Sequence, residues 1–270
     1  MGLNSEYAAR IKALVARSDH MAESEFLSRV LLAAALWRSK IWANTIGTEG
    51  THIRSGPFEG MDYVVQSAEG AMLPRLLGIY ERELHPALYR LAGEQIDHVI
   101  DVGCAEGYYA VGLARLLPNA TGHAFDIDET ARRRCAILAQ AHGVSDRIQI
   151  RGEFTGNQFE EFRGSRVLVF VDAEGFEDDL LRPDLHPALA DFDIIVETHP
   201  MHRPGITDRL TQRFASTHTI ERCDPKLGDA ELPDALANAG HLDMMIAAWE
   251  WRAGPTPWLI MQPRSRPSAA

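Results

Sequence analysis

Short apolar runs separated by helical stretches constrain the fold of this chain more than any other feature. From residue 97 onward, apolar bursts alternate with segments that have helical periodicity. Seven of the bursts are predicted strands: 98–102, 122–125, 148–151, 167–171, 194–197, 217–221 and 258–261. Unbroken apolar strands that alternate with helices are typical of a parallel sheet covered on both faces. The pattern therefore predicts an α/β fold.

Helices are expected between most of these strands and throughout the start of the chain. The helical stretches lie at 108–117, 129–142, 178–186 and 205–214. Residues 5–44 contain no Gly or Pro and favour helix, with a break at the pair Ser18 and Asp19. Two short strands, 51–54 and 61–65, and a helix over 73–92 follow. We predict a division into 1–72, an N-terminal helical extension acting as a lid or dimerisation segment, and 73–270, the main domain.

Composition narrows the classes of partner and compartment. The chain has 270 residues and a formal net charge of −11, which disfavours a nucleic-acid or anionic membrane partner. Its three cysteines form no CxxC pair, so a zinc ribbon is not expected. The apolar run over 30–37 is too short to cross a bilayer of about 30 Å. We therefore predict a cytoplasmic protein without nucleic-acid or membrane partners; the helices over 5–44 are candidate homodimer contacts.

The stretch HVIDVGCAEGYY, residues 98–109, contains the clearest candidate ligand loop. Asp101 ends an apolar run, and Gly103, Ala105 and Gly107 follow on alternate positions. Such a loop lies at the carboxyl edge of a sheet, where backbone N–H groups at the start of a helix approach a ligand. Asp126 ends the next strand, where a carboxylate accepts hydrogen bonds from ribose hydroxyls. The pair predicts a nucleotide-containing cofactor.

The spacing of the loop distinguishes between two cofactors. A GxGxxG fingerprint that starts at Gly103 requires a small residue at position 108, which is Tyr108, so a nicotinamide oxidoreductase is disfavoured. The order D-x-G-x-A-x-G instead resembles motif I of class I S-adenosylmethionine-dependent methyltransferases. Alanine in the middle position is compatible with a negative φ.

This resemblance implies a fold, a cofactor and a set of binding residues. The expected fold is Rossmann-like, with a mostly parallel seven-stranded sheet and an N-terminal helical extension, and residues 73–270 become the S-adenosyl-L-methionine-binding domain. The implied cofactor-binding residues are Asp101, Gly103, Ala105, Gly107, Asp126 and Glu153, of which Asp126 holds the ribose and Glu153 borders the adenine.

A second motif follows the fourth predicted strand. The sequence VFVDAEGFEDDLL, residues 169–181, contains Asp172, Glu174, Gly175 and Glu177 in the order D-x-E-G-x-E. With ETHP at 197–200, it resembles the FkbM-like branch of methyltransferases, which O-methylates hydroxyls of sugars and natural products. The resemblance implies a small-molecule hydroxyl as the methyl acceptor.

The catalytic candidates lie after the fourth and fifth strands: Asp172, Glu197 and His199. Methyl transfer is an in-line displacement, so the enzyme aligns a nucleophile and removes its proton. His199, with an ordinary pKa near 6.5, is a candidate general base, and so is Asp172. We favour this metal-free arrangement.

Other interpretations of the same residues stay open. Asp172, Glu197, His199 and His202 also suit a divalent metal, which would make the protein a metal-assisted O-methyltransferase. They are equally compatible with a helix cap and a solvated loop. A non-catalytic S-adenosylmethionine-binding protein is the alternative from another class. In the N-terminal third, Tyr80, Glu81 and His85 are the polar lid candidates, although Tyr80 and Leu84 also fit an apolar helix face, which is the favoured interpretation.

Overall fold

The central element of the computed structural model, which describes residues 2–67, 71–225, 236–252 and 254–265, is a seven-stranded sheet. Its order is β3-β2-β1-β4-β5-β7-β6. The strands are β1 (His98–Val102), β2 (Thr121–Phe125), β3 (Ile148–Arg151), β4 (Val167–Val171), β5 (Asp193–Glu197), β6 (His218–Cys223) and β7 (Trp258–Pro263). Strands β1 to β5 pair in parallel, and β7 enters antiparallel between β5 and β6. The predicted fold class, a Rossmann-like and mostly parallel sheet, is confirmed.

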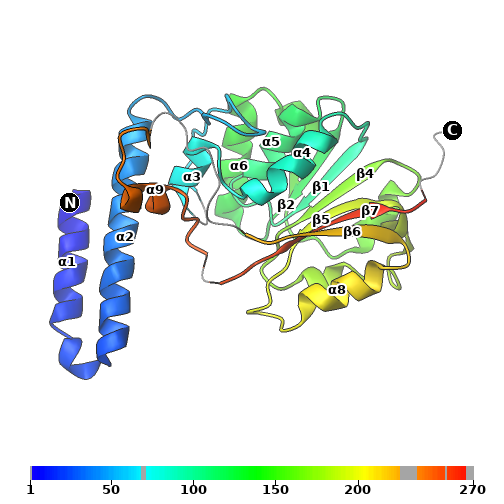
Figure 1. Ribbon diagram of the computed structural model, residues 1–270. Helices are drawn as coiled ribbons and strands as arrows, with labels where there is room; N and C mark the ends of the chain where they lie inside the picture. Colours follow the sequence, from blue (N-terminus) through cyan, green and yellow to red (C-terminus); the bar gives the residue numbers. More distant parts are fainter. Residues whose placement is uncertain (1, 68–70, 226–235, 253, 266–270) are drawn as a thin grey trace.

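Helices cover both faces of this sheet (Figure 1). One face carries α4 (His85–Leu91), α5 (Tyr108–Leu116) and α6 (Glu129–Ala141), and the other carries α8 (Ile206–Phe214). The side chains of β4 alternate between the two faces: Leu168 and Phe170 join the core beneath α5, and Val169 joins the core above α8. Because both faces are buried at the centre of the sheet, β4 is apolar at every position, whereas the edge strands β3 and β6 carry exposed polar residues.

The N-terminal helices form a hairpin beside the sheet domain (Figure 1). They are α1 (Leu3–Val15) and α2 (Glu23–Gly47), and the chain breaks between them at Ser18–His20, where a break was predicted. Helix α9 (His241–Ala247), which was not predicted, packs against α2, and Arg38 donates to Asp243 at 2.6 Å. Among the described residues, no helix is long and apolar enough to cross a membrane.

The segment that follows α2 contributes to the core of the sheet domain. Ile53, Met61 and Tyr63 are fully buried in the same hydrophobic cluster as the residues of α5. The predicted strand pair in this segment is reduced to a single antiparallel bridge between His52 and Asp62. The division of the chain at residue 72 stays a prediction, although the core extends to both sides of it.

Two predicted helices are shorter than expected, for local reasons. The stretch 73–92 divides into α3 (Met72–Leu77), η2 (Arg82–Leu84) and α4. Gly78 has a φ of +77°, and a Cβ there would lie 1.9 Å from the Ser55 carbonyl oxygen, so the backbone cannot continue as a helix. The stretch 178–186 contains only α7 (Glu177–Leu180), because Pro183 disfavours helical conformation in the residue before it.

Candidate functional site

The predicted cofactor loop lies at the carboxyl edge of the sheet, between β1 and β4. The strand order reverses at this point, which is where ligands bind in open α/β sheets. Gly103 has a φ of +87°, and a Cβ on it would lie 1.7 Å from the Asp172 carbonyl oxygen. The loop after β1 therefore contacts the backbone that follows β4. This contact joins the predicted cofactor loop to the predicted catalytic edge.

The rest of the loop is fixed by packing and by one carboxylate. Gly107, with a φ of +94°, begins α5 so close to α6 that a Cβ would lie 2.8 Å from the Cys135 sulfur. Ala105 has a φ of +47°, so the expectation of a negative φ was wrong. In this left-handed conformation the Ala105 N–H donates a hydrogen bond of 2.9 Å to Oδ2 of Asp126, a residue of the next strand end.

The two carboxylates that flank the loop differ in burial and in hydrogen bonding. Asp101 is almost fully buried, and burial together with the neighbouring Asp126 carboxylate raises the pKa of Asp101 to about 8. Its Oδ2 makes no hydrogen bond within the described part of the chain. Asp126 is partly exposed, and its Oδ1 accepts a hydrogen bond of 2.7 Å from the Asp128 N–H.

These features fit the cofactor that the sequence predicts. An orphaned buried carboxylate suits the ammonium group of S-adenosylmethionine, and a partly exposed carboxylate at the end of β2 suits ribose hydroxyls. Asp101, Gly103, Ala105, Gly107 and Asp126 form one group. Glu153 lies apart from it, exposed in the loop after β3, and its contact with adenine stays a prediction.

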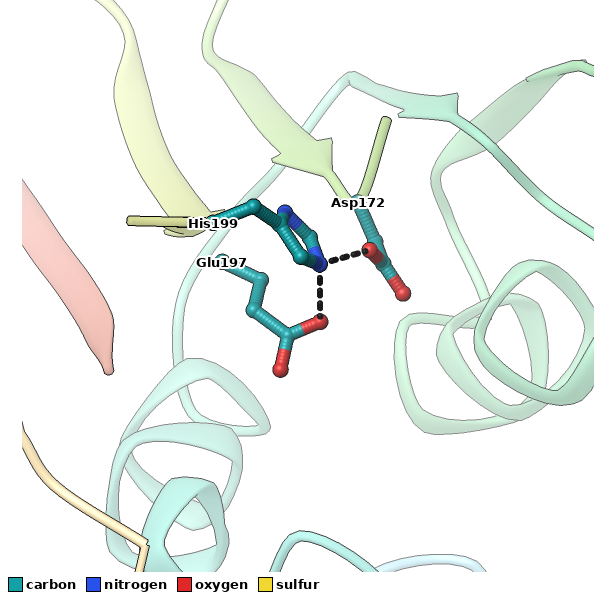
Figure 2. A group of neighbouring side chains, drawn as sticks. All are labelled: Asp172, Glu197 and His199. Atoms are coloured by element: carbon teal, nitrogen blue, oxygen red, sulfur yellow. Dashed lines mark ion pairs between the residues drawn. The ribbon is translucent and has the colours of Figure 1, made fainter. Parts of the chain in front are cut away.

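Asp172, Glu197 and His199 converge where β4 and β5 end (Figure 2). The Nε2 atom of His199 lies 3.6 Å from Oδ1 of Asp172 and 3.4 Å from Oε2 of Glu197. Glu197 and His199 are buried, whereas the Asp172 side chain is 27% exposed. The group therefore opens outward at Asp172, the residue that also contacts the cofactor loop.

A fourth residue, Glu177, holds the imidazole from the other side. Its Oε1 lies 2.8 Å from Nδ1 of His199 and also accepts the Gly175 N–H at 3.0 Å. Burial opposes the charged form of His199, but hydrogen bonds to Glu177 and Glu197 outweigh it and raise the pKa of His199 to about 11. The imidazole is thus already protonated at neutral pH in this structure, which disfavours its predicted role as the general base. Burial, together with Glu197, raises the pKa of Asp172 well above its ordinary value.

His202 does not join the group. It pairs instead with the exposed Glu174, with 3.4 Å between Nε2 and Oε2. Glu174 has a φ of +49° in the turn that precedes α7. The predicted four-residue metal set is therefore reduced to Asp172, Glu197 and His199, one ligand atom of each lying within 4.8 Å of the others.

A dense acidic network adjoins the group and was largely missed. Arg252 lies among four carboxylates: Glu81, Glu83, Glu197 and Glu250. Its Nη2 donates to Glu81 at 3.0 Å, its Nε donates to Glu250 at 2.7 Å, and its Nη1 donates to Glu197. Burial, with Glu197 nearby, raises the pKa of Glu81 to about 8. Arg252 stands in the stretch WEWRAG, where neither spacing nor period indicates a site.

The chain is similar to several known methyltransferases. No model of a known protein family matches it. A curated relative, the release factor glutamine methyltransferase of Synechocystis, is 29% identical over 114 residues, which are 40% of this chain and 37% of the relative. The chain thus matches little more than a third of the length of that relative.

Solved structures of methyltransferases are also similar. The O-methyltransferase TomG from Streptomyces achromogenes, solved in complex with S-adenosylmethionine, is 15% identical over 71% of this chain and 83% of its own, with a TM-score of 0.46. An rRNA methylase from Streptococcus thermophilus is 11% identical over 68% of this chain and 98% of its own, with a TM-score of 0.48. The predicted enzyme class and cofactor agree with these relatives. The sheet order itself defines the class: a Rossmann-like fold of the class I methyltransferase type.

One prediction is corrected by the comparisons. A small-molecule hydroxyl acceptor and the absence of a nucleic-acid partner were expected, and this was wrong. The relatives include a methyltransferase named for a release factor and one named for rRNA, which are a protein and a nucleic acid. The physical reason is that a net charge of −11 describes the overall field, whereas a macromolecular substrate is recognised by a local surface.

Proposed function

We propose that the protein is an S-adenosylmethionine-dependent methyltransferase that methylates the oxygen of a hydroxyl group. The observation that carries the proposal is the contact between Gly103 and the Asp172 backbone, because it sets the cofactor loop against a side chain able to remove a proton. Asp172 is also the most exposed member of its group, so an acceptor can reach it.

Different residues are assigned to cofactor binding and to proton removal. When bound, S-adenosylmethionine supplies a methyl group on a sulfonium sulfur. Asp101 would hold its ammonium group, and Asp126 would hold its ribose hydroxyls. In its ionised form the Asp172 carboxylate would orient the acceptor hydroxyl and accept its proton; the sulfonium would supply the methyl group and keep the C–S electron pair as a neutral thioether. Glu177 and Glu197 fix His199, which lies beside the Asp172 carboxylate.

The motif around Asp172 supports an assignment to the FkbM-like branch. The D-x-E-G-x-E segment supplies both Asp172 and Glu177, and the acidic end of β5 supplies Glu197. These three carboxylates surround His199 within 3.6 Å. The carboxylates that these sequence segments supply thus form one group around the imidazole of His199.

The experiment that tests this function follows a labelled methyl group. Purified protein is incubated with methyl-labelled S-adenosylmethionine and fractionated cell extracts, and the label is expected in an alkali-stable methyl ether. Asp172→Asn should lower turnover by about 10²–10⁴-fold, the usual contribution of general-base catalysis, and should leave S-adenosylhomocysteine affinity unchanged. Glu174→Gln, a matched change on an exposed carboxylate two residues away, should retain turnover.

Other outcomes would contradict the proposal. Label on an amide nitrogen would assign the chain the activity for which its curated relative is named. Binding of NAD in place of S-adenosylhomocysteine, measured by calorimetry, would remove the methyltransferase assignment itself.

A further inference from the structure

We propose that Asp172, Glu197 and His199 form a binding site for one divalent transition-metal cation, for which Mn²⁺ is the probe. The role of the ion, to hold and acidify the acceptor hydroxyl, rests on the proposed function; the site itself rests on geometry. Two carboxylate oxygens and one imidazole nitrogen suit Mn²⁺, Fe²⁺ or Zn²⁺ better than Ca²⁺ or Mg²⁺, which prefer oxygen ligands alone.

The two separations from the His199 nitrogen are close to those expected around a shared ion, and all three ligand atoms lie within 4.8 Å of one another. Ligand atoms held at about 2.1 Å from one ion, and 90–110° apart around it, lie about 3.0–3.4 Å from each other. The Nε2 atom of His199 lies 3.4 Å from Glu197 Oε2 and 3.6 Å from Asp172 Oδ1. Figure 2 shows Asp172 and Glu197 each directing one carboxylate oxygen toward the same ring nitrogen of His199. Small side-chain rotations would therefore bring the three ligand atoms to bonding distance from an ion.

Glu177 provides an independent indication, because it lies outside the three ligands and orients one of them. Its side chain is fully buried, and it lies 2.8 Å from Nδ1 of His199. Metal-binding histidines usually donate one ring N–H to a carboxylate, which directs the other nitrogen toward the ion. Here the nitrogen so directed is Nε2, which faces Asp172 and Glu197. The Oδ1 atom of Asp172 is buried and makes no hydrogen bond to the described residues.

The charges next to the site favour a cation. Arg252 is shared by four carboxylates, one of which is the ligand Glu197. Buried carboxylates in such excess repel one another, and a divalent ion at Glu197 would offset that repulsion. With three protein ligands the ion keeps open positions, and a hydroxyl oxygen bound there loses its proton more readily. The exposed side of Asp172 provides access for that hydroxyl.

The experiment measures Mn²⁺ binding to the full chain, with no acceptor and no turnover. The free-Mn²⁺ signal in electron paramagnetic resonance is expected to report one bound ion per chain. Glu177→Gln should weaken the affinity by about 10–100-fold, the usual effect of removing an outer partner of a ligand. His199→Gln should weaken it further. His202→Gln, a matched change on an exposed histidine outside the group, should leave it unchanged.

Separate measurements, the melting temperature and the S-adenosylhomocysteine affinity, test metal binding, folding and function. Mn²⁺ should raise the melting temperature of the wild type and of His202→Gln, as a ligand of the native state does, but not that of His199→Gln. S-adenosylhomocysteine affinity in each variant shows that the fold is intact and tests the proposed function on its own. If His199→Gln does not fold, Asp172→Asn takes its place. The metal site is disproved if the wild type binds no Mn²⁺, or if the ligand variants bind it as tightly as the wild type.

Discussion

Ala105 shows how one backbone angle in the cofactor loop affects stability. A non-glycine residue at a φ of +47° costs about 1–2 kcal/mol, because its Cβ crowds the following carbonyl. Ala105→Gly should therefore raise the free energy of unfolding by about 0.5–1 kcal/mol, after the extra freedom of glycine in the unfolded chain is subtracted. Ala136→Gly, an exposed position inside α6, should lower it by about 1 kcal/mol. Urea titrations measure the free energy of unfolding of both variants. An equal decrease in the two variants would contradict the backbone strain at Ala105.

Asp101 should make cofactor binding depend on pH. Burial, with Asp126 nearby, raises the pKa of Asp101 to about 8, so below that pH the carboxyl is protonated in the free protein. An ammonium group beside it favours the ionised form, and binding should release a proton. The Kd of S-adenosylhomocysteine should fall as pH rises from 6 to 7.5, by at most about tenfold per pH unit. Calorimetry in two buffers measures the proton, and Asp101→Asn should abolish its release.

At the scale of elements, the central strands β1, β4 and β5 were predictable because they are buried on both faces of the sheet. Within β4, neighbouring side chains enter different cores, so the whole run is apolar and stands out in the sequence. The helix over 73–92 was overestimated for the opposite reason. Its break at Gly78 depends on contact with Ser55, a residue more than 20 positions away, and periodicity carries no record of such contacts.

The pairing of β1 with β2 contains a pH-dependent contribution to stability. Burial, with His98 and Arg151 nearby, lowers the pKa of His123 to about 4, and its Nε2 lies 3.2 Å from Nδ1 of His98. Between pH 6.5 and 4 the unfolded state therefore binds a proton that the folded state does not. Stability should be lost as pH falls through this window, by at most about 1.4 kcal/mol per pH unit.

A variant comparison isolates this contribution. The free energy of unfolding of His123→Gln should fall less steeply with pH than that of the wild type between pH 6.5 and 4. His202→Gln, which replaces an exposed histidine, should follow the wild-type curve. Parallel curves for all three proteins would show that His123 does not titrate as the structure indicates.

At the scale of the whole molecule, Arg252 links parts of the chain that are far apart. It pairs with Glu81 before the sheet, with Glu197 at the end of β5 and with Glu250 in its own segment. Arg252→Ala would remove the cation that these carboxylates share and should lower the free energy of unfolding by about 3–5 kcal/mol. Arg222→Ala removes an exposed pair with Asp224 and should change it by less than about 1 kcal/mol. Comparable losses in urea titrations would refute the role of Arg252.

The candidate site was only partly predictable from the sequence. The physical reason is that strand ends place some of its residues and distant contacts place the others. Asp172, Glu197 and His199 stand at or within two residues of the ends of β4 and β5, and the ends of parallel strands meet at one edge, so their proximity could be deduced. Arg252 reaches the same place from a loop before an antiparallel strand. Nothing local fixes the position of such a loop. The charge state of His199 depends on Glu177, and this contact joins the start of α7 to the segment after β5, which no local sequence pattern indicates.

The position of β7 between β5 and β6 has a consequence for the order of events during synthesis. Translation produces Arg252 and β7 after every other element of the site. A nascent chain that has already emerged through β6 still lacks the strand that joins β5 to β6 and the guanidinium that holds Glu81 and Glu197. The acidic site can therefore be completed only after residue 252 has been made, and a chain stalled on the ribosome before that residue has no complete site.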